Sequence, residues 1–362
     1  MTETYLPPAH RPSQTPIIDL AVVSDSTYVE TVGVMLHSIL RWHDPASLRV
    51  HWVHVRMDRQ AIRSARELSR AAGLVVNLVA ADAVLAAADW PADVNPTIAK
   101  IHLPDLLADV CERVLYLDGD LVVEDVLWPM WEIELGDAAL AGVRDSWVGC
   151  SQFWSMLPRS VEVAHELWMR PHYINAGVLL YDVARCRALD LGQRCTSWIR
   201  TNPAAHFFEQ DALNVVLDGA IALAHPAWNV HGGPDSYVLE AEPRSGYSTG
   251  ELRSAYRQPK IIHFAGSQKP WGEAKHWLPL SRRYFRARRR TPWHRDLSVA
   301  EHLHLAALTL AHRVQCHRQL RAARAIQYAG RAVLSIDTLV RSLRASDHAA
   351  VSDEWPADRR QG

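Results

Sequence analysis

Residues 114–123 read VLYLDGDLVV, an apolar run that is interrupted by two aspartates and then resumes. An apolar run of this length predicts a buried strand of a parallel sheet. Asp118 and Asp120 follow it directly, with Gly119 between them. Carboxylates two residues apart at a strand end project to the same side, and a glycine lets a bulky ligand approach the backbone. The pair therefore has the geometry to hold one divalent cation, although Asp and Gly are also ordinary turn residues.

Around this stretch, short apolar runs alternate with segments of helical spacing. The strand-like runs cover residues 17–24, 48–55, 74–79, 113–117, 139–143, 177–181 and 260–264, and the helical segments cover 29–41, 60–72, 97–107, 183–200 and 210–217. This order predicts an α/β fold with a mostly parallel sheet covered by helices on both faces. In such sheets ligands lie outside the carboxyl ends of the strands, so the chemistry is expected just after Val23 and just after Leu117.

Composition narrows the class of protein. The chain has 362 residues, of which 48% are hydrophobic, so a disordered chain is excluded and one large or two modest domains are expected. With 39 Lys and Arg against 40 Asp and Glu, the net charge of −1 argues against a nucleic-acid partner. Five cysteines without a CxxC pair fit a reducing compartment. We expect a cytoplasmic protein, because no signal peptide and no membrane-spanning apolar run is recognised.

The C-terminal part differs in charge from the rest. Residues 281–344 hold fourteen arginines against three acidic residues, and we expect a basic helical extension over 281–345. Apolar residues recur there at helical spacing: Leu303, Ala306, Ala307, Leu310, Val333, Ile336, Leu339, Val340 and Leu343. Such a helix either lies on an anionic membrane surface or packs its stripe on the main domain, and both interpretations stay open. Residues 1–16 are predicted to be a flexible tail and 346–362 a disordered one.

Other motifs carry chemistry only weakly by themselves. Residues 261–271 read IIHFAGSQKPW, in which His263 leaves an apolar strand ahead of Gly266 and Lys269. The imidazole suits a metal and the ammonium a phosphate, but a lone histidine there is more often structural. Two further motifs taken alone are ordinary turn and helix-cap devices, namely Asn175-Ala176-Gly177 and Glu209-Gln210-Asp211.

In combination these motifs resemble glycosyltransferase family 8, which includes bacterial lipopolysaccharide galactosyl- and glucosyltransferases and glycogenin. The resemblance covers about Ile17 to Trp277 and also takes in Asp25 and Tyr28 after the first strand. It implies a glycosyltransferase A fold over residues 17–280. It also implies retaining transfer of glucose or galactose from a UDP-sugar to a glycan, lipid-linked or small-molecule acceptor. In bacterial members a basic extension attaches the enzyme to the membrane, which would place this chain peripherally on the inner face of the cell membrane.

The resemblance also implies roles for single residues. Asp118, Asp120 and His263 would be metal ligands, and such a mixed set suits Mn²⁺ better than Mg²⁺. The remaining donor contacts would come from Val23, Asp25, Thr27, Tyr28, Lys100, Gly119, Asn175, Ala176, Gly177, Gly266 and Lys269, with Asp118 also among them. Gln210 would lie close to the reacting face of the sugar, with Glu209 and Asp211 beside it. Asp145 would face the acceptor.

The sequence departs from the family pattern at two positions, and two alternative functions stay open. The family more often has Asp at the position of Glu209, which leaves the choice of hexose open. It also commonly has a bulky apolar residue or alanine at the position of Gly119. A sugar nucleotidyltransferase would want a glycine-rich, basic loop after the first strand, and residues 23–28 have neither. A catalytically inactive protein that binds nucleotide sugar or glycan is the second alternative. The sequence does not choose between a covalent intermediate and same-face attack.

Overall fold

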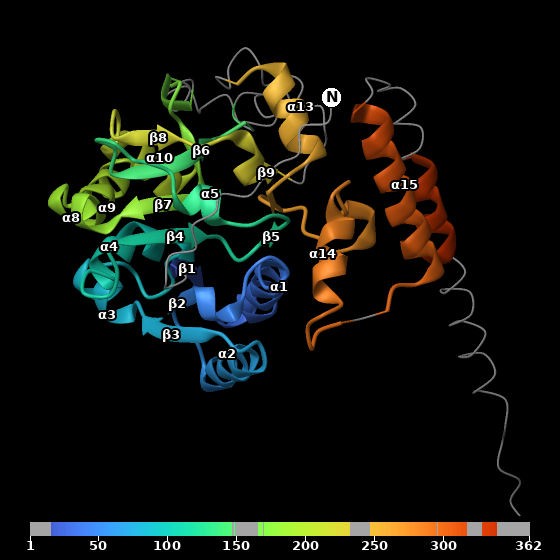
Figure 1. The fold of residues 1–362 in the computed structure, drawn as a ribbon, viewed down its shortest axis with the longest axis horizontal. Coiled ribbons are helices and arrows are strands. Elements are labelled where there is room, and N and C mark those ends of the chain that lie inside the picture. The colour runs from blue at the N-terminus through green and yellow to red at the C-terminus, as the bar shows by residue number, and fades with distance from the viewer. Residues whose placement is uncertain are drawn as a thin grey trace, which may run out of the picture.

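A computed structural model describes residues 16–146, 148, 166–168, 170–231, 247–294, 296–316 and 328–338. Its centre is a seven-stranded sheet in the order β3-β2-β1-β4-β7-β6-β8 (Figure 1). The strands are β1 Ile18–Ser24, β2 Leu48–His54, β3 Val75–Ala80, β4 Arg113–Leu117, β6 Leu140–Arg144, β7 Ile174–Asp182 and β8 Ile221–Leu223. All pairings except those of β7 are parallel, which confirms the predicted mostly parallel sheet.

Helices cover both faces of this sheet, as expected from the buried character of its strands. Alternate residues of β1 point to opposite faces, so Leu20 packs in one apolar cluster and Ala21 in another. The first cluster is covered by α1 Val29–Ile39 and α2 Arg59–Ala71, and the second by η3 Pro96–His102, α4 Leu103–Leu106, α9 Leu191–Thr201 and α10 Phe208–Val216. Shorter elements are η1 Ser26–Tyr28, η2 Pro45–Ser47, α3 Asp82–Ala87, α5 Trp128–Trp131, α8 Val183–Ala188, η4 Pro226–Asn229 and η5 Ala274–His276.

Two predicted helices are wrong in detail. The segment 97–107 is mostly a 3-10 helix, and Leu103 donates its N–H to the Lys100 carbonyl oxygen. The following residue, Pro104, has no N–H with which to continue an α-helical ladder. The segment 183–200 is two helices, because Asp190 has φ 49° and ψ 43°. A left-handed residue cannot lie inside a right-handed helix, so the chain turns between α8 and α9.

Strand β7 runs against its neighbours, which the sequence did not indicate. It also begins three residues earlier than predicted, at Ile174. Leu117 pairs with Val178 in antiparallel register, and Asp118 donates its N–H to the Gly177 carbonyl oxygen at 2.9 Å. The amino end of β7 therefore lies beside the carboxyl end of β4.

A second, smaller sheet adjoins the first and has the order β5-β10-β9. Its strands are β5 Leu121–Val123, β9 Val230–His231 and β10 Ile261–His263. Residues 260–264, expected to be a strand of the same domain, do contain a strand, and it lies in this second sheet and not in the central one. After β4 the chain turns at Asp118-Gly119-Asp120 and enters β5, which pairs antiparallel with β10. This turn brings the aspartates and His263 to the junction of the two sheets.

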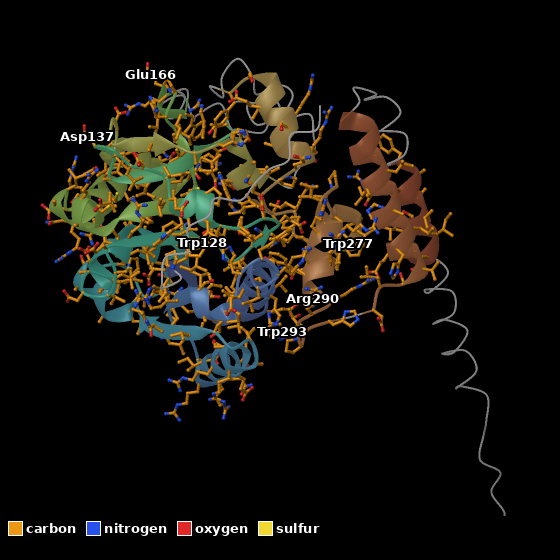
Figure 2. The ribbon with its side chains drawn as sticks, viewed as in Figure 1. Trp128, Asp137, Glu166, Trp277, Arg290 and Trp293 are labelled. Carbon is orange, nitrogen blue, oxygen red and sulfur yellow. The ribbon has the colours of Figure 1, made fainter. Side chains whose placement is uncertain are left out.

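The C-terminal helices lie on one side of the molecule (Figure 1). They follow α13 Thr249–Arg257 and comprise α14 Ser281–Arg288 and α15 Val299–Cys316. Helix α14 packs against α1, and Phe285, Leu305 and Leu308 share an apolar cluster with Val34 of α1. Figure 2 labels Trp293, beyond α14, whose ring would lie 2.4 Å from a Cβ added at Gly33 of α1.

One face of α15 is thus buried, whereas Val299, Leu303 and Leu310 are exposed. Residues 328–338 form a further helical segment, and Gly330 lies close enough to Ala307 that an added Cβ would be 2.7 Å from it. Leu339, Val340, Leu343 and the predicted tails, apart from Pro16, lie outside the described residues. No helix within the described ranges is both long and apolar enough to cross a membrane.

Candidate active site

Three predicted metal ligands meet where the two sheets join. The His263 Nε2 atom lies 3.2 Å from Asp120 Oδ1 and 3.7 Å from Asp118 Oδ2. The three ligand atoms lie within 4.8 Å of one another. The aspartates come from the turn after β4 and the histidine from the end of β10. Asp120 and His263 are 143 residues apart in the sequence. The fold therefore gathers at one point residues that are distant in sequence.

The orientation of His263 is fixed from behind. Its Nδ1 lies 2.9 Å from the amide oxygen of Asn229, so Nδ1 carries the proton and donates it. Asn229 in turn donates to Asn175 at 2.8 Å. Gly177 leaves the room that the ring needs, because a Cβ there would lie 2.3 Å from His263 Cε1. A hydrogen bond of this kind fixes the tautomer of a metal-binding histidine.

This geometry fits a divalent cation. With the proton on Nδ1, the Nε2 lone pair of His263 faces two carboxylate oxygens across a small space. Three acceptors cannot hydrogen-bond one another, so a cation or an added proton must lie among them for the arrangement to be favourable. Two oxygens and one imidazole nitrogen are a donor set that Mn²⁺ accepts.

Two ammonium groups hold the outer oxygens of the aspartates. Lys269 contacts Asp120 Oδ2 and donates to the Phe264 carbonyl oxygen at 2.7 Å. Lys100 donates to Asp118 Oδ1 at 3.0 Å and lies 3.5 Å from Glu209 Oε1. The inner oxygens are thereby left directed at His263.

The charges of these groups are stabilised mutually. Burial disfavours ionisation of Asp120, but an added proton on His263 Nε2 and the ammonium of Lys269 outweigh it and hold the pKa of this carboxyl well below its usual range. Burial likewise disfavours the charged form of Lys100, yet Asp118 and Glu209 raise its pKa above the usual value. Both side chains are therefore charged at neutral pH. Because the site is buried, the electrostatic interactions between them and a bound ion are stronger than in water.

The predicted sugar-side residues form a hydrogen-bonded network. Gln210 accepts through Oε1 from the Ala176 N–H at 3.0 Å and from Asn175 Nδ2 at 3.2 Å. Its Nε2 donates to Asp145 Oδ2 at 3.0 Å and to the Tyr173 hydroxyl at 3.1 Å. All four bonds agree with one orientation of the amide. The residues that resemblance assigned to the donor sugar and the acceptor thus form one cluster.

The buried carboxylate of Asp211 accepts hydrogen bonds that hold this network in place. One of its oxygens accepts from the Tyr173 hydroxyl at 2.6 Å and from Trp168 Nε1 at 2.8 Å, and the other from the Phe207 N–H at 2.9 Å. The residue is 1% exposed. Because its carboxylate is engaged by three internal donors, Asp211 fixes the position of Tyr173 and the start of α10.

The predicted nucleobase end lies after β1, where Val23 is the last residue but one of the strand. Asp25 Oδ1 caps η1 by accepting from the N–H and the hydroxyl of Thr27, at 2.8 and 2.6 Å. The Tyr28 ring is 37% exposed, and a Cβ at Gly119 would lie 3.6 Å from it. Tyr28 ends the short helix η1 that follows β1, and its exposed ring offers a face on which a base can stack. Gly266 has φ +77°, which only glycine adopts without strain.

Sequence reasoning missed five residues that contact these groups: Tyr116, Trp168, Tyr173, Asn229 and His231. The Tyr116 hydroxyl contacts Asp118 Oδ1. Tyr173 lies two residues before Asn175, so a shared strand face would have signalled it. The His231 ring lies edge-on to His263 at 5.6 Å between centroids. Burial lowers the pKa of His231 to about 4. Nothing in the sequence marked His231 apart from the other histidines.

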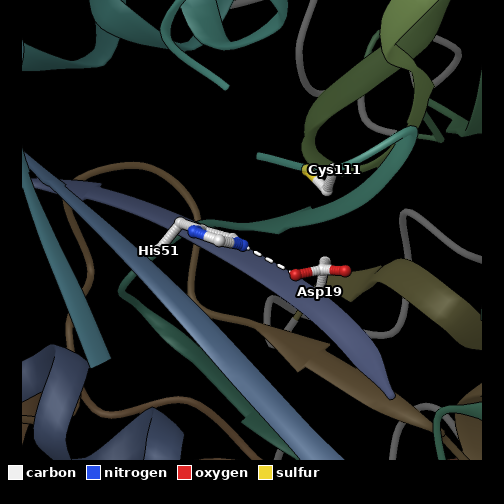
Figure 3. Close-up of side chains that lie close together, drawn as sticks. All are labelled: Asp19, His51 and Cys111. Atoms are coloured by element: carbon white, nitrogen blue, oxygen red, sulfur yellow. Dashed lines mark hydrogen bonds and ion pairs between the residues drawn. The ribbon is translucent and has the colours of Figure 1, made fainter. Parts of the chain in front are cut away.

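A second group of possible ligand types is a structural network. Asp19, His51 and Cys111 lie together near the amino end of β1 (Figure 3). His51 Nε2 lies 2.8 Å from Asp19 Oδ1, and Arg49 binds both Asp19 oxygens at 2.5 and 2.8 Å. Burial raises the pKa of the Cys111 thiol to about 12. A single carboxylate neutralised by a guanidinium, beside a protonated thiol, makes a poor cation site.

These observations define the class of protein. The fold is the glycosyltransferase A fold, which galactosyltransferase LgtC in complex with donor and acceptor sugar analogs shares at a TM-score of 0.61 and 22% identity, over 78% of this chain and 98% of that one. The WbbM bifunctional glycosyltransferase matches at a TM-score of 0.63 and 21% identity, over 79% of this chain and 52% of its own.

The family follows from sequence. The chain belongs to glycosyl transferase family 8, whose model matches residues 19–275. Among curated relatives, the probable galacturonosyltransferase-like 8 of Arabidopsis thaliana is 24% identical over 283 residues. That match covers 70% of this chain and 66% of the relative, so the chain spans just under two thirds of the relative's length. The resemblance to this family that the motifs indicated is therefore confirmed.

Proposed function

We propose that the protein is a retaining, metal-dependent glycosyltransferase that moves glucose or galactose from a UDP-sugar to a hydroxyl of a glycan, lipid-linked or small-molecule acceptor. The observation that carries this proposal is the convergence of Asp118, Asp120 and His263 within 4.8 Å. In the reaction the bond between the anomeric carbon and the diphosphate oxygen breaks, and a bond to the acceptor oxygen forms. The acceptor proton leaves with the diphosphate or passes to water.

The residues divide this work by position. A cation held by Asp118, Asp120 and His263, Mn²⁺ in preference to Mg²⁺, would neutralise charge developing on the diphosphate. Lys269, beside Asp120, can add a positive charge at the same place. Gln210 lies with Asn175 and Ala176 where the sugar would bind. Tyr28 would stack on the base.

The decisive experiment compares two aspartates on the same stretch of chain. D120N removes a ligand, whereas D125N changes a carboxylate that pairs with Lys260 away from the cluster. We expect D120N to weaken UDP binding in the presence of Mn²⁺ by about a hundredfold or more and to abolish hydrolysis of UDP-glucose and UDP-galactose. Calorimetry and UDP release measure both effects. Activity that survives EDTA and D120N would contradict the metal assignment.

The same assays separate the alternatives. Tight binding of UDP with Mn²⁺, but no turnover of any nucleotide sugar, would favour an inactive binding protein. Formation of a nucleotide sugar from UTP and a sugar phosphate would favour a nucleotidyltransferase. A nucleotidyltransferase needs a loop after β1 that binds phosphates. The short helix η1 at this place contains no lysine or arginine, which argues against that activity.

The donor sugar is the least constrained part of the proposal. The relative named above is called galacturonosyltransferase-like, and a uronic acid donor would bring its own carboxylate. Here Glu209 already lies 3.5 Å from Lys100, and Asp145 borders the same network. Added negative charge beside these carboxylates is unfavourable, so we expect faster turnover of UDP-sugars whose hexose is uncharged than of UDP-galacturonic acid. A comparison of kcat/KM for the donors tests this.

We also propose peripheral contact with the inner face of the cell membrane from the cytoplasm. Helix α15 exposes Val299, Leu303 and Leu310 while its other face packs on the domain. The surrounding segment is rich in arginine, which favours anionic lipid. Co-sedimentation with phosphatidylglycerol vesicles, but not with phosphatidylcholine vesicles, is expected for the wild type and should be lost in a variant carrying L303E and L310E.

A further inference from the structure

His231 ends strand β9 and lies next to the candidate metal ligand His263. In the parallel pairing of β9 with β10 the two histidines are direct partners. Their rings meet edge to face, at 5.6 Å between centroids and 88° between planes. His231 is not among the proposed metal ligands or donor contacts, so no role explains its position beside them.

The polar neighbours of His231 form hydrogen bonds within the protein, whereas His231 forms none with the described residues. His263 bonds to Asn229, and Asn229 bonds to Asn175. By contrast, neither ring nitrogen of His231 takes part in a hydrogen bond within the described part of the chain, and the side chain is half-buried. An imidazole offers one donor and one acceptor when neutral. Both remain available to a bound molecule.

The charges around His231 place it near the acceptor side. Burial and the neighbouring His263 lower the pKa of His231, while the carboxylates of Asp145 and Asp120 lie near enough to oppose that shift. Asp145 accepts from Gln210 Nε2 at 3.0 Å. His231 is therefore close both to the metal cluster and to the network that holds Gln210. A side chain between the proposed metal site and the proposed sugar site is well placed to contact an acceptor hydroxyl.

We infer that His231 contacts the acceptor and orients its hydroxyl group for transfer. This inference rests on the proposed function. The imidazole nitrogen accepts a hydrogen bond from the hydroxyl, which directs an oxygen lone pair at the anomeric carbon. As the new carbon–oxygen bond forms and the bond to the diphosphate breaks, the hydroxyl proton leaves with the diphosphate, so His231 keeps no proton. Water is the simplest occupant of this position.

The test uses water and glycerol as acceptors, so no natural acceptor is needed. H231F keeps a flat ring without nitrogens, H231N restores a donor and an acceptor, and H302F alters an exposed histidine of α15 as a control. We expect H231F to lower kcat for hydrolysis of UDP-glucose or UDP-galactose, and for transfer to glycerol, by about tenfold or more. KM for the donor and the affinity for UDP with Mn²⁺ should stay within about twofold. H231N should recover part of kcat, and H302F should match the wild type.

Each other outcome overturns something definite. If the wild type turns over the donor and H231F has the same kcat, the role of His231 is overturned but the proposed function is not. A parallel loss of UDP–Mn²⁺ affinity, or of thermal stability, would show a structural or donor-side role and would also overturn the inference. A wild type that hydrolyses no nucleotide sugar would instead overturn the proposed function.

Discussion

The orientation of the Gln210 amide depends partly on Tyr173, a residue for which no ligand contact is proposed. Tyr173 donates its hydroxyl proton to Asp211, so its oxygen is free to accept from Gln210 Nε2. Trp168 fixes the same Asp211 oxygen from the other side. If Gln210 lies at the reacting face, its carbonyl direction is set by this chain of donors and acceptors.

Replacing Tyr173 with phenylalanine tests that dependence. Y173F removes two hydrogen bonds, so we expect stability to fall by about 1–3 kcal/mol and donor turnover by about tenfold, with UDP–Mn²⁺ affinity little changed. Y284F is the matched control, since Tyr284 is also buried but its hydroxyl has no partner among the described residues. Unfolding in urea and UDP release measure the two effects. Equal turnover in Y173F and Y284F would contradict the positioning role.

A pH dependence of stability is expected from Asp19. Burial disfavours its charge, but the hydrogen bonds from His51 and Arg49 outweigh this and lower its pKa. A lowered pKa in the folded state contributes stability above the unfolded value of about 3.9, and this contribution is lost as pH falls through the folded value. We expect D19N to be destabilised by about 2 kcal/mol at pH 7 and progressively less below about pH 4.

Urea unfolding of the wild type and D19N across this pH range measures the difference. D109N, at an exposed aspartate with no resolved interaction in the described part of the chain, should show no such difference. A constant gap between wild type and D19N would contradict the pKa assignment.

At the residue scale, the sequence indicated the candidate ligand residues but not the residues that orient them through hydrogen bonds. Asp118, Asp120 and His263 are recognisable because metal ligands come from a short menu of residue types. Asn229 and Tyr173 were not recognisable, because amides and phenols serve many structural purposes. Their roles depend on which strands pair, and spacing along the chain does not encode pairing.

At the scale of elements, the boundary between α8 and α9 offers a test. Asp190 adopts a left-handed backbone, with φ 49°, and its side chain makes no cap bond. Glycine adopts this conformation without a steric cost, whereas alanine does not. We expect D190G to stabilise the protein by about 0.5–1 kcal/mol and D190A to destabilise it by about 1 kcal/mol, measured by urea unfolding. Effects of the same sign in both variants would contradict the backbone explanation.

The direction of β7 could not be predicted from its own residues. An apolar run reads the same whether the strand is parallel or antiparallel. The difference decides the site, because the reversed strand brings its amino end, with Asn175 and Gly177, to the carboxyl end of β4. The mostly parallel sheet was predictable from alternation, and the one reversed strand was not. The same limit applies to β10, whose apolar run gave no indication that it belongs to another sheet.

At the scale of the whole molecule, α14 is part of the folded body although its sequence is strongly basic. Its Tyr284 and Phe285 share a cluster with Val34 of α1, and Arg288 pairs with Glu30. We expect truncation after residue 280 to lower the melting temperature by about 5 °C or more, because it exposes this cluster.

Truncation after residue 338 is the matched control and should leave melting temperature and UDP–Mn²⁺ affinity unchanged. Differential scanning fluorimetry measures both chains. Equal stability of the two truncations would show that α14 contributes nothing to folding and would support an independent extension from residue 281.

The lysines that flank the two aspartates have a consequence for handling the protein. Because each carboxylate already has an ammonium partner within the chain, we expect the polypeptide to fold without a bound cation. Prolonged dialysis against a chelator should therefore yield a folded, dormant enzyme that regains full turnover when manganese is restored. A zinc-finger domain behaves oppositely, since it unravels once stripped.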